Sequence, residues 1–242
     1  MIKIIHAYPN LMNLYGEYAN ALILQKRLEC AGLEAVVTHY NAGEDLDLSE
    51  CDFLYIGSGD ERSTLAALRD MIRHSDELKG YVERGGKALL TGSAGVLISH
   101  SVTLDTGEAQ PRLWLSDINA IMTGKVRYAE YVVTTPLVES EIIGVINTTT
   151  KLSSSQTPFF TIQCGTEPSD IKTEGFVKNS LYTTQFTGPL LVRNPALLDY
   201  FAALVAGRDL EPCGESWFAH MIKGHDTVLR SLKDACAEAV DS

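Results

Sequence analysis

The chain has 242 residues, of which 45% are hydrophobic and 21% charged, a composition typical of a soluble globular protein with a sizeable core. Its formal net charge of −11 argues against nucleic acid as a partner and against insertion into an anionic membrane, because both reward basic surfaces. No apolar run is long enough for a signal peptide or a membrane span, so we expect a cytoplasmic protein.

Strands and helices alternate through the first part of the chain. The expected strands are residues 2–8, 33–39, 53–56 and 87–91. The expected helices are residues 14–29, a segment with Leu65, Leu68 and Ile72 on one face, and a segment ending at residue 83. This alternation predicts a mostly parallel sheet with helices on both faces.

The second half is rich in Thr, Ser, Val and Ile and has little helical periodicity. The strand candidates there are residues 126–134, 141–146, 159–163, 172–177 and 181–186. Asn194 is placed to cap a helix over residues 195–206, and a long amphipathic helix is expected over 217–239. We interpret residues 1–242 as a single α/β domain with a strand-rich second half and a C-terminal helical extension over 210–242.

The cysteines give no sign of a metal site. They are odd in number, widely scattered and without a C-x-x-C pair: Cys30, Cys51, Cys164, Cys213 and Cys236. We therefore expect reduced, mostly structural thiols, with no metal and no cofactor.

Two turns carry the candidate chemistry. The strand over 53–56 ends in Gly57-Ser58-Gly59, and the strand over 87–91 runs into Gly92-Ser93. Because ligands bind beyond the carboxyl ends of parallel strands, we expect the two turns to share a pocket rim. The second turn has the strand–turn–helix pattern on which α/β hydrolases mount a nucleophile, yet the nucleophile position reads Gly92.

Ser93 is the alternative nucleophile at this turn. A catalytic serine needs a neighbouring base, usually histidine. His100 is the one histidine close downstream, and we expect His220 and His225 at the surface of the C-terminal helix. A small residue that permits a tight turn is therefore the simpler interpretation of Ser93.

Several segments support a family resemblance. They are Tyr8-Pro9-Asn10-Leu11-Met12-Asn13-Leu14-Tyr15-Gly16-Glu17-Tyr18-Ala19-Asn20, residues 51–59, residues 83–91, Asp105-Thr106-Gly107 and Gly188-Pro189-Leu190-Leu191. Together they resemble the cobyric-acid-synthase-like group of class I glutamine amidotransferases, and within it the glutaminase subunits of lipid II isoglutaminyl synthase. The resemblance covers nearly the whole chain and is most specific in the first third.

The resemblance implies a flavodoxin-like class I glutamine amidotransferase fold. It implies that an elbow cysteine attacks the glutamine amide, that a histidine before Gly-Pro acts as base, and that backbone N–H groups of the two turns stabilise the oxyanion. It also implies that ammonia passes to a Mur-ligase-like partner, which amidates the D-glutamate of the peptidoglycan stem peptide.

The residues at the decisive positions differ from the family pattern. The cysteine position is Gly92, the histidine position is Thr187, and the middle glycine of the first turn is Ser58. Arg127 aligns with a glutamine-contacting arginine if one gap is allowed. The nucleophile and the base are therefore both absent.

Three hypotheses follow. The first is a subunit without glutaminase activity that forms a heterodimer with a Mur-ligase-like protein as a structural or regulatory partner. The second is an active amide hydrolase that uses Ser93. The third is a non-catalytic sensor that binds glutamine or a related amino acid through Gly57, Ser58, Gly59 and Arg127.

Overall fold

Five parallel strands form one half of the sheet. The computed structural model describes residues 1–167 and 171–240, and the spatial order in this half is β2-β1-β3-β4-β10. The strands are β1 (Ile2–Ala7), β2 (Ala35–Tyr40), β3 (Phe53–Ile56), β4 (Ala88–Leu90) and β10 (Leu181–Thr183). All four residues of β3 are buried, which is typical of a parallel strand covered on both faces.

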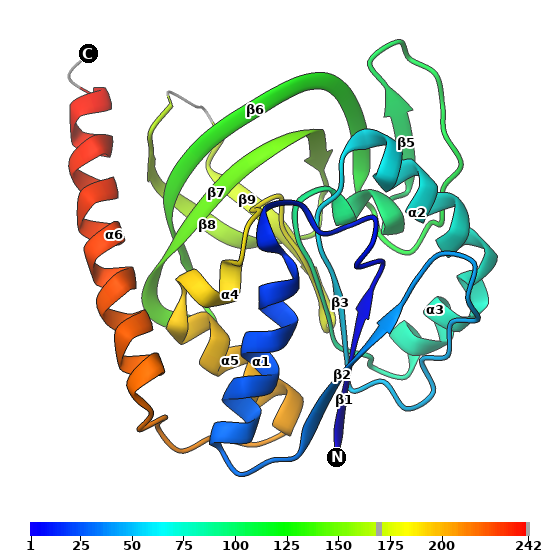
Figure 1. The fold of residues 1–242 in the computed structure, drawn as a ribbon. Coiled ribbons are helices and arrows are strands. Elements are labelled where there is room, and N and C mark those ends of the chain that lie inside the picture. The colour runs from blue at the N-terminus through cyan, green and yellow to red at the C-terminus, as the bar shows by residue number, and fades with distance from the viewer. Residues whose placement is uncertain (168–170, 241–242) are drawn as a thin grey trace.

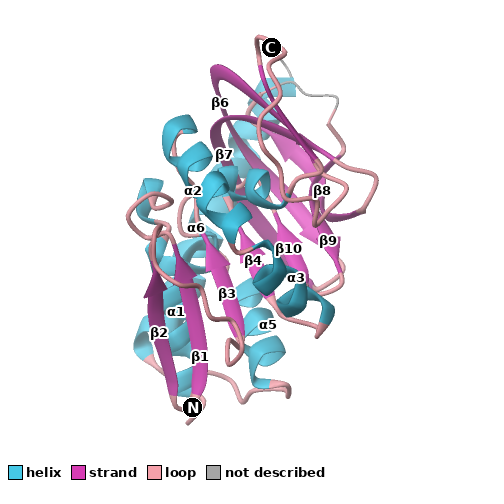
Figure 2. Ribbon diagram, turned by 90° about the vertical axis from the view of Figure 1, so that its right-hand side faces the viewer, coloured by secondary structure: helices cyan, strands magenta, loops and turns pink. Residues whose placement is uncertain are grey.

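Helices cover both faces of these strands, as the sequence predicted (Figure 2). On one face, α1 (Tyr18–Cys30), α4 (Leu190–Arg193) and α5 (Pro195–Ala206) contribute to one hydrophobic core. On the other, α2 (Glu61–Arg73), α3 (Ser75–Glu83) and the 3-10 helix η2 (Gly92–Ile98) contribute to a second. The sheet therefore lies between two apolar layers, and its strand ends are held from both sides.

The second half of the chain extends the sheet with further strands, two of which are long and bent (Figure 1). They are β5 (Ser101–Leu104), β6 (Asn119–Thr135), β7 (Val138–Ser153), β8 (Thr157–Gly165) and β9 (Thr173–Lys178). The pairs β6–β7, β6–β8, β8–β9 and β9–β10 are antiparallel. The prediction of a strand-rich second half is confirmed, and β6 and β7 run well beyond the expected 126–134 and 141–146.

The N-terminal segment is not the single helix expected over residues 14–29. A 3-10 turn, η1 (Leu14–Gly16), precedes α1, and Tyr15 and Gly16 have φ of 61° and 78°. These left-handed conformations cannot continue a right-handed helix. The backbone N–H of Leu14 instead donates to the Ser58 carbonyl at 2.9 Å, which holds this loop against the glycine turn.

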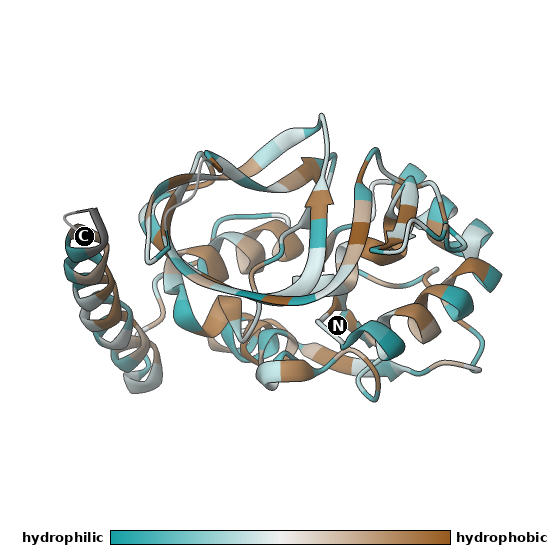
Figure 3. Ribbon diagram, turned by 90° about the horizontal axis from the view of Figure 1, so that it is seen from above, coloured by the Kyte–Doolittle hydropathy of each residue, from teal (hydrophilic) through white to brown (hydrophobic). Residues whose placement is uncertain are grey.

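The C-terminal helix α6 (Ser216–Val240) lies at one end of the molecule, beside the curved strands β6 and β7 (Figure 3). The helix expected over 217–239 is confirmed, but the extension is not helical from residue 210, because Gly207 ends α5 in a left-handed cap and residues 208–215 are irregular. Residues 241 and 242 lie outside the described residues. Within the described ranges, none of the helices has the length and hydrophobicity that crossing a bilayer requires.

The expectation that every cysteine is reduced was wrong. Cys30, the last residue of α1, forms a disulfide with Cys213, which lies between α5 and α6. The two residues are 183 positions apart, so their spacing in the sequence gives no hint of the pairing. Cys51, Cys164 and Cys236 are free.

The disulfide predicts a thiol count. Protein purified and unfolded without reductant should show three reactive thiols, because Cys30 and Cys213 are paired. A Cys30→Ala variant should show four, since Cys213 is released, and it should lose about 2–5 kcal/mol of stability with the cross-link. Titration with a chromogenic thiol reagent measures the thiol counts of the two proteins, and urea unfolding measures the loss of stability. Five reactive thiols in the unreduced wild type would contradict the pairing.

Candidate functional site

The turn after β4 keeps the backbone of a nucleophile elbow. The strand ends at Leu90, Thr91 is extended, and Gly92 has φ of +60° at the start of η2. Glycine adopts this left-handed conformation without steric penalty. The turn therefore presents residue 92 beyond the carboxyl end of the strand, but it presents no side chain.

The space at Gly92 is already occupied. A Cβ atom built on Gly92 would overlap the Cβ and Oγ of Ser58 and would lie 2.9 Å from Cγ2 of Thr187. Ser58, Gly92 and Thr187 are all buried, and Ser58 and Thr187 are only 1% and 3% exposed. The side chains at the middle-glycine and base positions thus fill the volume in which a nucleophile would stand.

Gly57-Ser58-Gly59 lies against the elbow, so the two turns are close as expected, but both are buried and neither lines the cavity that contains Arg127, so the expected shared pocket rim is not confirmed. The flanking glycines are required by the N-terminal loop: a Cβ at Gly57 would lie 2.5 Å from the Met12 carbonyl oxygen, and one at Gly59 would lie 2.8 Å from that of Leu11. The turn is buried beneath this loop rather than open to solvent.

Two serine hydroxyls bind backbone N–H groups of the two turns, from which the resemblance implies an oxyanion hole. The N–H of Ser93 donates to Ser58 Oγ at 3.2 Å, and the N–H of Gly59 donates to Ser93 Oγ at 3.0 Å. An oxyanion hole works through preorganised donors that point at the developing charge. Here both donors are satisfied within the protein.

Among the described residues, no base is hydrogen-bonded to Ser93. The residue is 2% exposed, and its Oγ bonds to the backbone of Gly59 and to Thr64 Oγ1 at 2.8 Å. None of these partners can accept a proton near pH 7, so the hydroxyl has no means of activation.

Thr187 turns its polar atom away from the elbow. Its Oγ1 donates to the Val145 carbonyl at 3.3 Å, while its methyl group faces Gly92. The backbone N–H of Thr187 donates to the same carbonyl at 2.7 Å. The base position therefore contributes packing in place of a proton acceptor.

Arg127, a residue of β6, lies in a different place. It lines a cavity of about 540 Å³ together with Lys151, Glu174 and Gln185, whereas Gly57, Gly59 and Gly92 are not among the lining residues. Its Nη2 donates to Gln185 Oε1 at 3.3 Å, and its buried Nε has no partner among the described residues. The structure thus separates Arg127 from the glycine turn with which the sequence grouped it.

The most connected polar group near the elbow is one that sequence reasoning missed, the carboxylate of Glu17. It is fully buried and accepts hydrogen bonds from Tyr55, Thr91 and the backbone N–H of Gly188, at 2.5, 2.7 and 2.8 Å. Asn20 also donates to it at 3.2 Å. The available signal was the Tyr15–Asn20 stretch of the resemblance, which contains Glu17 and Asn20.

Burial raises the pKa of Glu17 to about 7, although the four hydrogen bonds to its carboxylate oppose the shift. A carboxyl group in this state could serve as an acid or a base, but its oxygens are engaged by the protein itself. Among the described residues, no group of three or more His, Cys, Asp or Glu side chains is arranged to hold a metal ion.

Comparisons with known proteins find relatives that match most of the chain. No family model matches the chain. It is 24% identical over 210 residues to the lipid II isoglutaminyl synthase (glutamine-hydrolyzing) subunit GatD of Staphylococcus aureus strain N315, a match that covers 82% of each chain. It is 23% identical over 200 residues to the GatD subunit of Streptococcus pneumoniae strain R6, covering 81% of this chain and 77% of that one.

Among solved structures, a glutamine amidotransferase from Thermotoga maritima matches with a TM-score of 0.52 and 11% identity over 100% of this chain and 99% of that chain. This likeness shows the fold. The chain has the flavodoxin-like class I glutamine amidotransferase fold, and the resemblance stated from the sequence is confirmed.

The filled elbow predicts the effect of a side chain at residue 92. Gly92→Ala should lower the free energy of unfolding by about 3 kcal/mol, because a left-handed alanine is strained and its methyl group overlaps Ser58. Gly207→Ala is the matched control: Gly207 has φ of +67° and open space around a Cβ, so it should lose only about 1 kcal/mol.

Adding Ser58→Gly to Gly92→Ala should relieve the overlap. In urea unfolding, the double variant should be more stable than the sum of the two single losses predicts, by at least about 1 kcal/mol. If the stability losses of the two single variants simply add, or if Gly92→Ala and Gly207→Ala lose the same stability, then the space at Gly92 is not filled by Ser58.

Glu17 predicts a pH dependence. Because its pKa rises from 4.5 to about 7 on folding, the unfolded chain loses the proton first, and stability falls between about pH 4.5 and 7 by roughly 3 kcal/mol. The free energy of unfolding of wild type minus that of Glu17→Gln should therefore decrease by this amount between pH 4.5 and pH 8.

Urea unfolding of both proteins across this range measures the difference. Burial lowers the pKa of His6 to about 4, so His6 contributes the opposite slope below pH 6.5, but this contribution is common to both proteins and cancels. A stability difference that stays constant with pH would mean that Glu17 is not held in this environment.

Proposed function

We propose that this chain is a glutamine amidotransferase-like subunit without glutaminase activity, which pairs with a Mur-ligase-like protein in the amidation of D-glutamate in the peptidoglycan stem peptide. The similarity to GatD subunits over about four fifths of the chain supports the pathway and the role as a subunit. In this proposal the chain acts in the cytoplasm as one domain and needs no cofactor of its own.

The observation that carries the proposal is the occupied space at Gly92. A glycine offers no atom for covalent attack, and the overlap with Ser58 and Thr187 leaves no room for one. Loss of a nucleophile or of its partner base lowers turnover by roughly 10⁶ in comparable enzymes. Both positions are replaced here, and their replacements pack against each other.

The pattern of hydrogen bonds supports the same conclusion. If the site bound glutamine, the N–H groups of Gly59 and Ser93 would be free to face its amide oxygen. They are instead bonded to Ser93 Oγ and Ser58 Oγ, and both serines are buried. A ligand would have to displace the two hydroxyls and the loop that covers the glycine turn.

The two other hypotheses have less support. The hydrolase hypothesis needs a base for Ser93, whose side-chain partners are Gly59 and Thr64. The sensor hypothesis needs Gly57, Gly59 and Arg127 at one site, whereas Arg127 lies in a separate cavity and the glycine turn is buried. A scaffolding or regulatory role in a complex needs neither a base beside Ser93 nor a site that joins the glycine turn to Arg127.

The role as a partner predicts a stable complex that uses ammonia but not glutamine. When the chain is co-expressed with the Mur-ligase-like protein, the two should co-elute in size exclusion as a heterodimer. With ATP and a D-glutamate-containing stem peptide, the complex should amidate the substrate from an ammonium salt, and glutamine should not replace the salt.

The control is the glutamine-hydrolyzing GatD of S. aureus with its own partner, assayed with both nitrogen sources. Failure of the two proteins to co-elute would refute the role as a subunit. Amidation supported by glutamine would refute the loss of glutaminase activity.

A further inference from the structure

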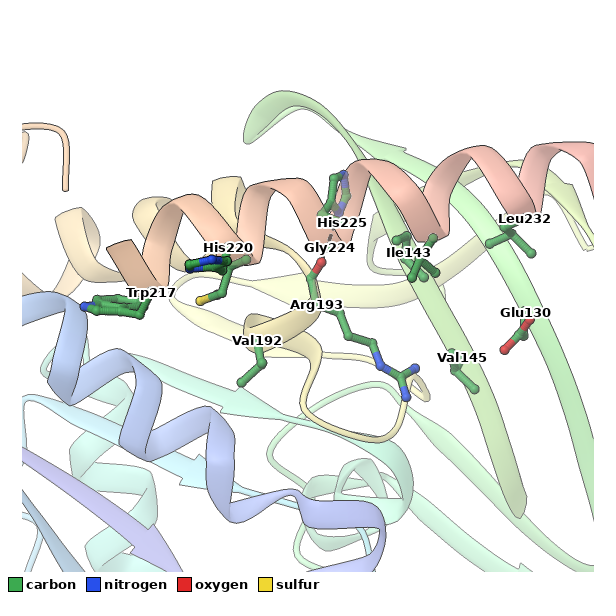
Figure 4. A pocket seen from close by; sticks show the side chains of 12 residues that line it. Glu130, Ile143, Val145, Val192, Arg193, Trp217, His220, Gly224, His225 and Leu232 are labelled. Atoms are coloured by element: carbon green, nitrogen blue, oxygen red, sulfur yellow. Dashed lines mark hydrogen bonds between the residues drawn. The ribbon is translucent and has the colours of Figure 1, made fainter. Parts of the chain in front are cut away.

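Helix α6 is attached to the rest of the protein at few places. Its side chains are mostly exposed, and a cavity of about 530 Å³ separates its middle from β7 and α4 (Figure 4). The wall opposite α6 is firmly held, because the Asn194 side chain accepts from the N–H of Ile143 at 2.8 Å and donates to its carbonyl at 3.0 Å. The helix is therefore the less firmly held side of this cavity.

The first half of α6 is held by contacts of three kinds. Before the helix, Cys213 is linked to Cys30, and Phe218 packs into the main core. The expectation that His225 lies at the surface was wrong: it is 7% exposed, and its Nδ1 is 2.9 Å from the Arg193 carbonyl. A covalent link, an apolar contact and a hydrogen bond thus fix this half.

The second half of α6 is held mainly by two side chains. Beyond residue 225, the buried residues of the described part of the helix are Leu232 and Cys236. They pack with Val132 of β6 and Ile143 of β7 in a small cluster that is separate from the two main cores. Elements held by few buried apolar contacts open locally at a low cost in free energy. We therefore expect this half of the helix to open more readily than the first.

A free thiol of β8 meets Cys236 in this cluster. Cys164 is the cross-strand partner of Val132 in the β6–β8 pair, and its side chain packs against the cluster. Burial raises the pKa of the Cys236 thiol, and so does a hydrogen bond with the Cys164 thiol. Cys236 is 3% exposed, whereas Cys164 is half-buried. The two free thiols are thus in contact, and one of them can be reached from solvent.

We propose that Cys164 and Cys236 are a site of reversible oxidation by small disulfides of the glutathione type, which join the two thiols in a second disulfide. The Cys164 thiolate attacks one sulfur of the small disulfide, forms a mixed disulfide and releases the first small thiolate. The Cys236 thiolate then attacks Cys164 Sγ, forms the intramolecular bond and releases the second. The two protons of the protein thiols go to the released thiolates, so two protein thiols are oxidised and one small disulfide is reduced.

This second disulfide locks the loosely held half of α6 to β8. The chain just before α6 is already linked through Cys213 to Cys30, so the new bond at Cys236 ties the helix at both ends. The Lys233–Glu141 ion pair also joins this half to β7, but it is solvent-accessible and adds little. The site uses no residue of the elbow, so it is independent of the proposed function.

Treatment with bis(2-hydroxyethyl) disulfide at pH 8.5, followed by peptide mapping without reductant, tests the site. Wild type should yield a peptide in which Cys164 and Cys236 are cross-linked, with no reagent retained on either. Cys51→Ser is the matched control, because Cys51 packs against the other core and contacts Tyr81. This variant should form the same cross-link and lose the mass of two hydrogen atoms. Absence of the cross-linked peptide from both proteins would overturn the proposal.

Single variants test the order of the two steps. Cys236→Ala should retain half of the reagent on Cys164 as a stable mixed disulfide, because no second thiol displaces it. Cys164→Ala should take up reagent on Cys236 about tenfold more slowly, because Cys236 is buried. Equal accumulation of the mixed disulfide in wild type and in folded Cys236→Ala would contradict the role of Cys236.

Hydrogen exchange of the reduced and oxidised wild type measures the effect on α6 without any substitution. The amides of residues 226–238 should exchange about tenfold more slowly after oxidation, because local opening of this half is then blocked. The amides of α2, which packs in the other core, should exchange at the same rate in both forms. Unchanged exchange over residues 226–238 would refute the locking of the helix.

Discussion

One buried carboxylate holds the parts of the elbow together. Glu17 comes from the N-terminal loop and accepts from Tyr55 on β3, from Thr91 at the end of β4 and from Gly188 before α4. Three segments distant in sequence therefore meet on one side chain with no water between them. Burying this group without its donors would cost several kcal/mol, so its position depends on all of the donors at once.

This network explains how the backbone of the elbow keeps its shape although residues 92 and 187 are glycine and threonine. The Glu17 carboxylate fixes the backbone of the elbow and of the loop that carries Thr187, whichever side chains stand at positions 92 and 187. Within that fixed frame, Ser58 and Thr187 have filled the vacant volume at Gly92, and serine hydroxyls satisfy the free N–H groups. The result is a closed, internally hydrogen-bonded core at the carboxyl ends of β3 and β4.

Helices and buried strands whose formation depends on neighbouring residues were predictable from the sequence. The helix predicted over 195–206 is α5, although Asn194 makes no capping hydrogen bond, and the apolar run 53–56 is the buried strand β3. Long-range partners were not predictable. The Cys30–Cys213 disulfide and the attachment of Asn194 to β7 join residues far apart in sequence, and no spacing rule encodes such pairs. For the site, the sequence identified the missing side chains, whereas the structure was needed to show that their space is filled.

We propose that the elbow cannot form a covalent bond with glutamine, because residue 92 is a glycine and its surrounding space is filled. Incubation of the purified chain, alone and in complex with its partner, with an electrophilic glutamine analogue tests this most directly when intact mass and peptide mapping follow. We expect an unchanged mass under conditions that fully label the glutamine-hydrolyzing GatD subunit of S. aureus. A stoichiometric adduct on Ser93, or on any other residue of the elbow, would contradict it.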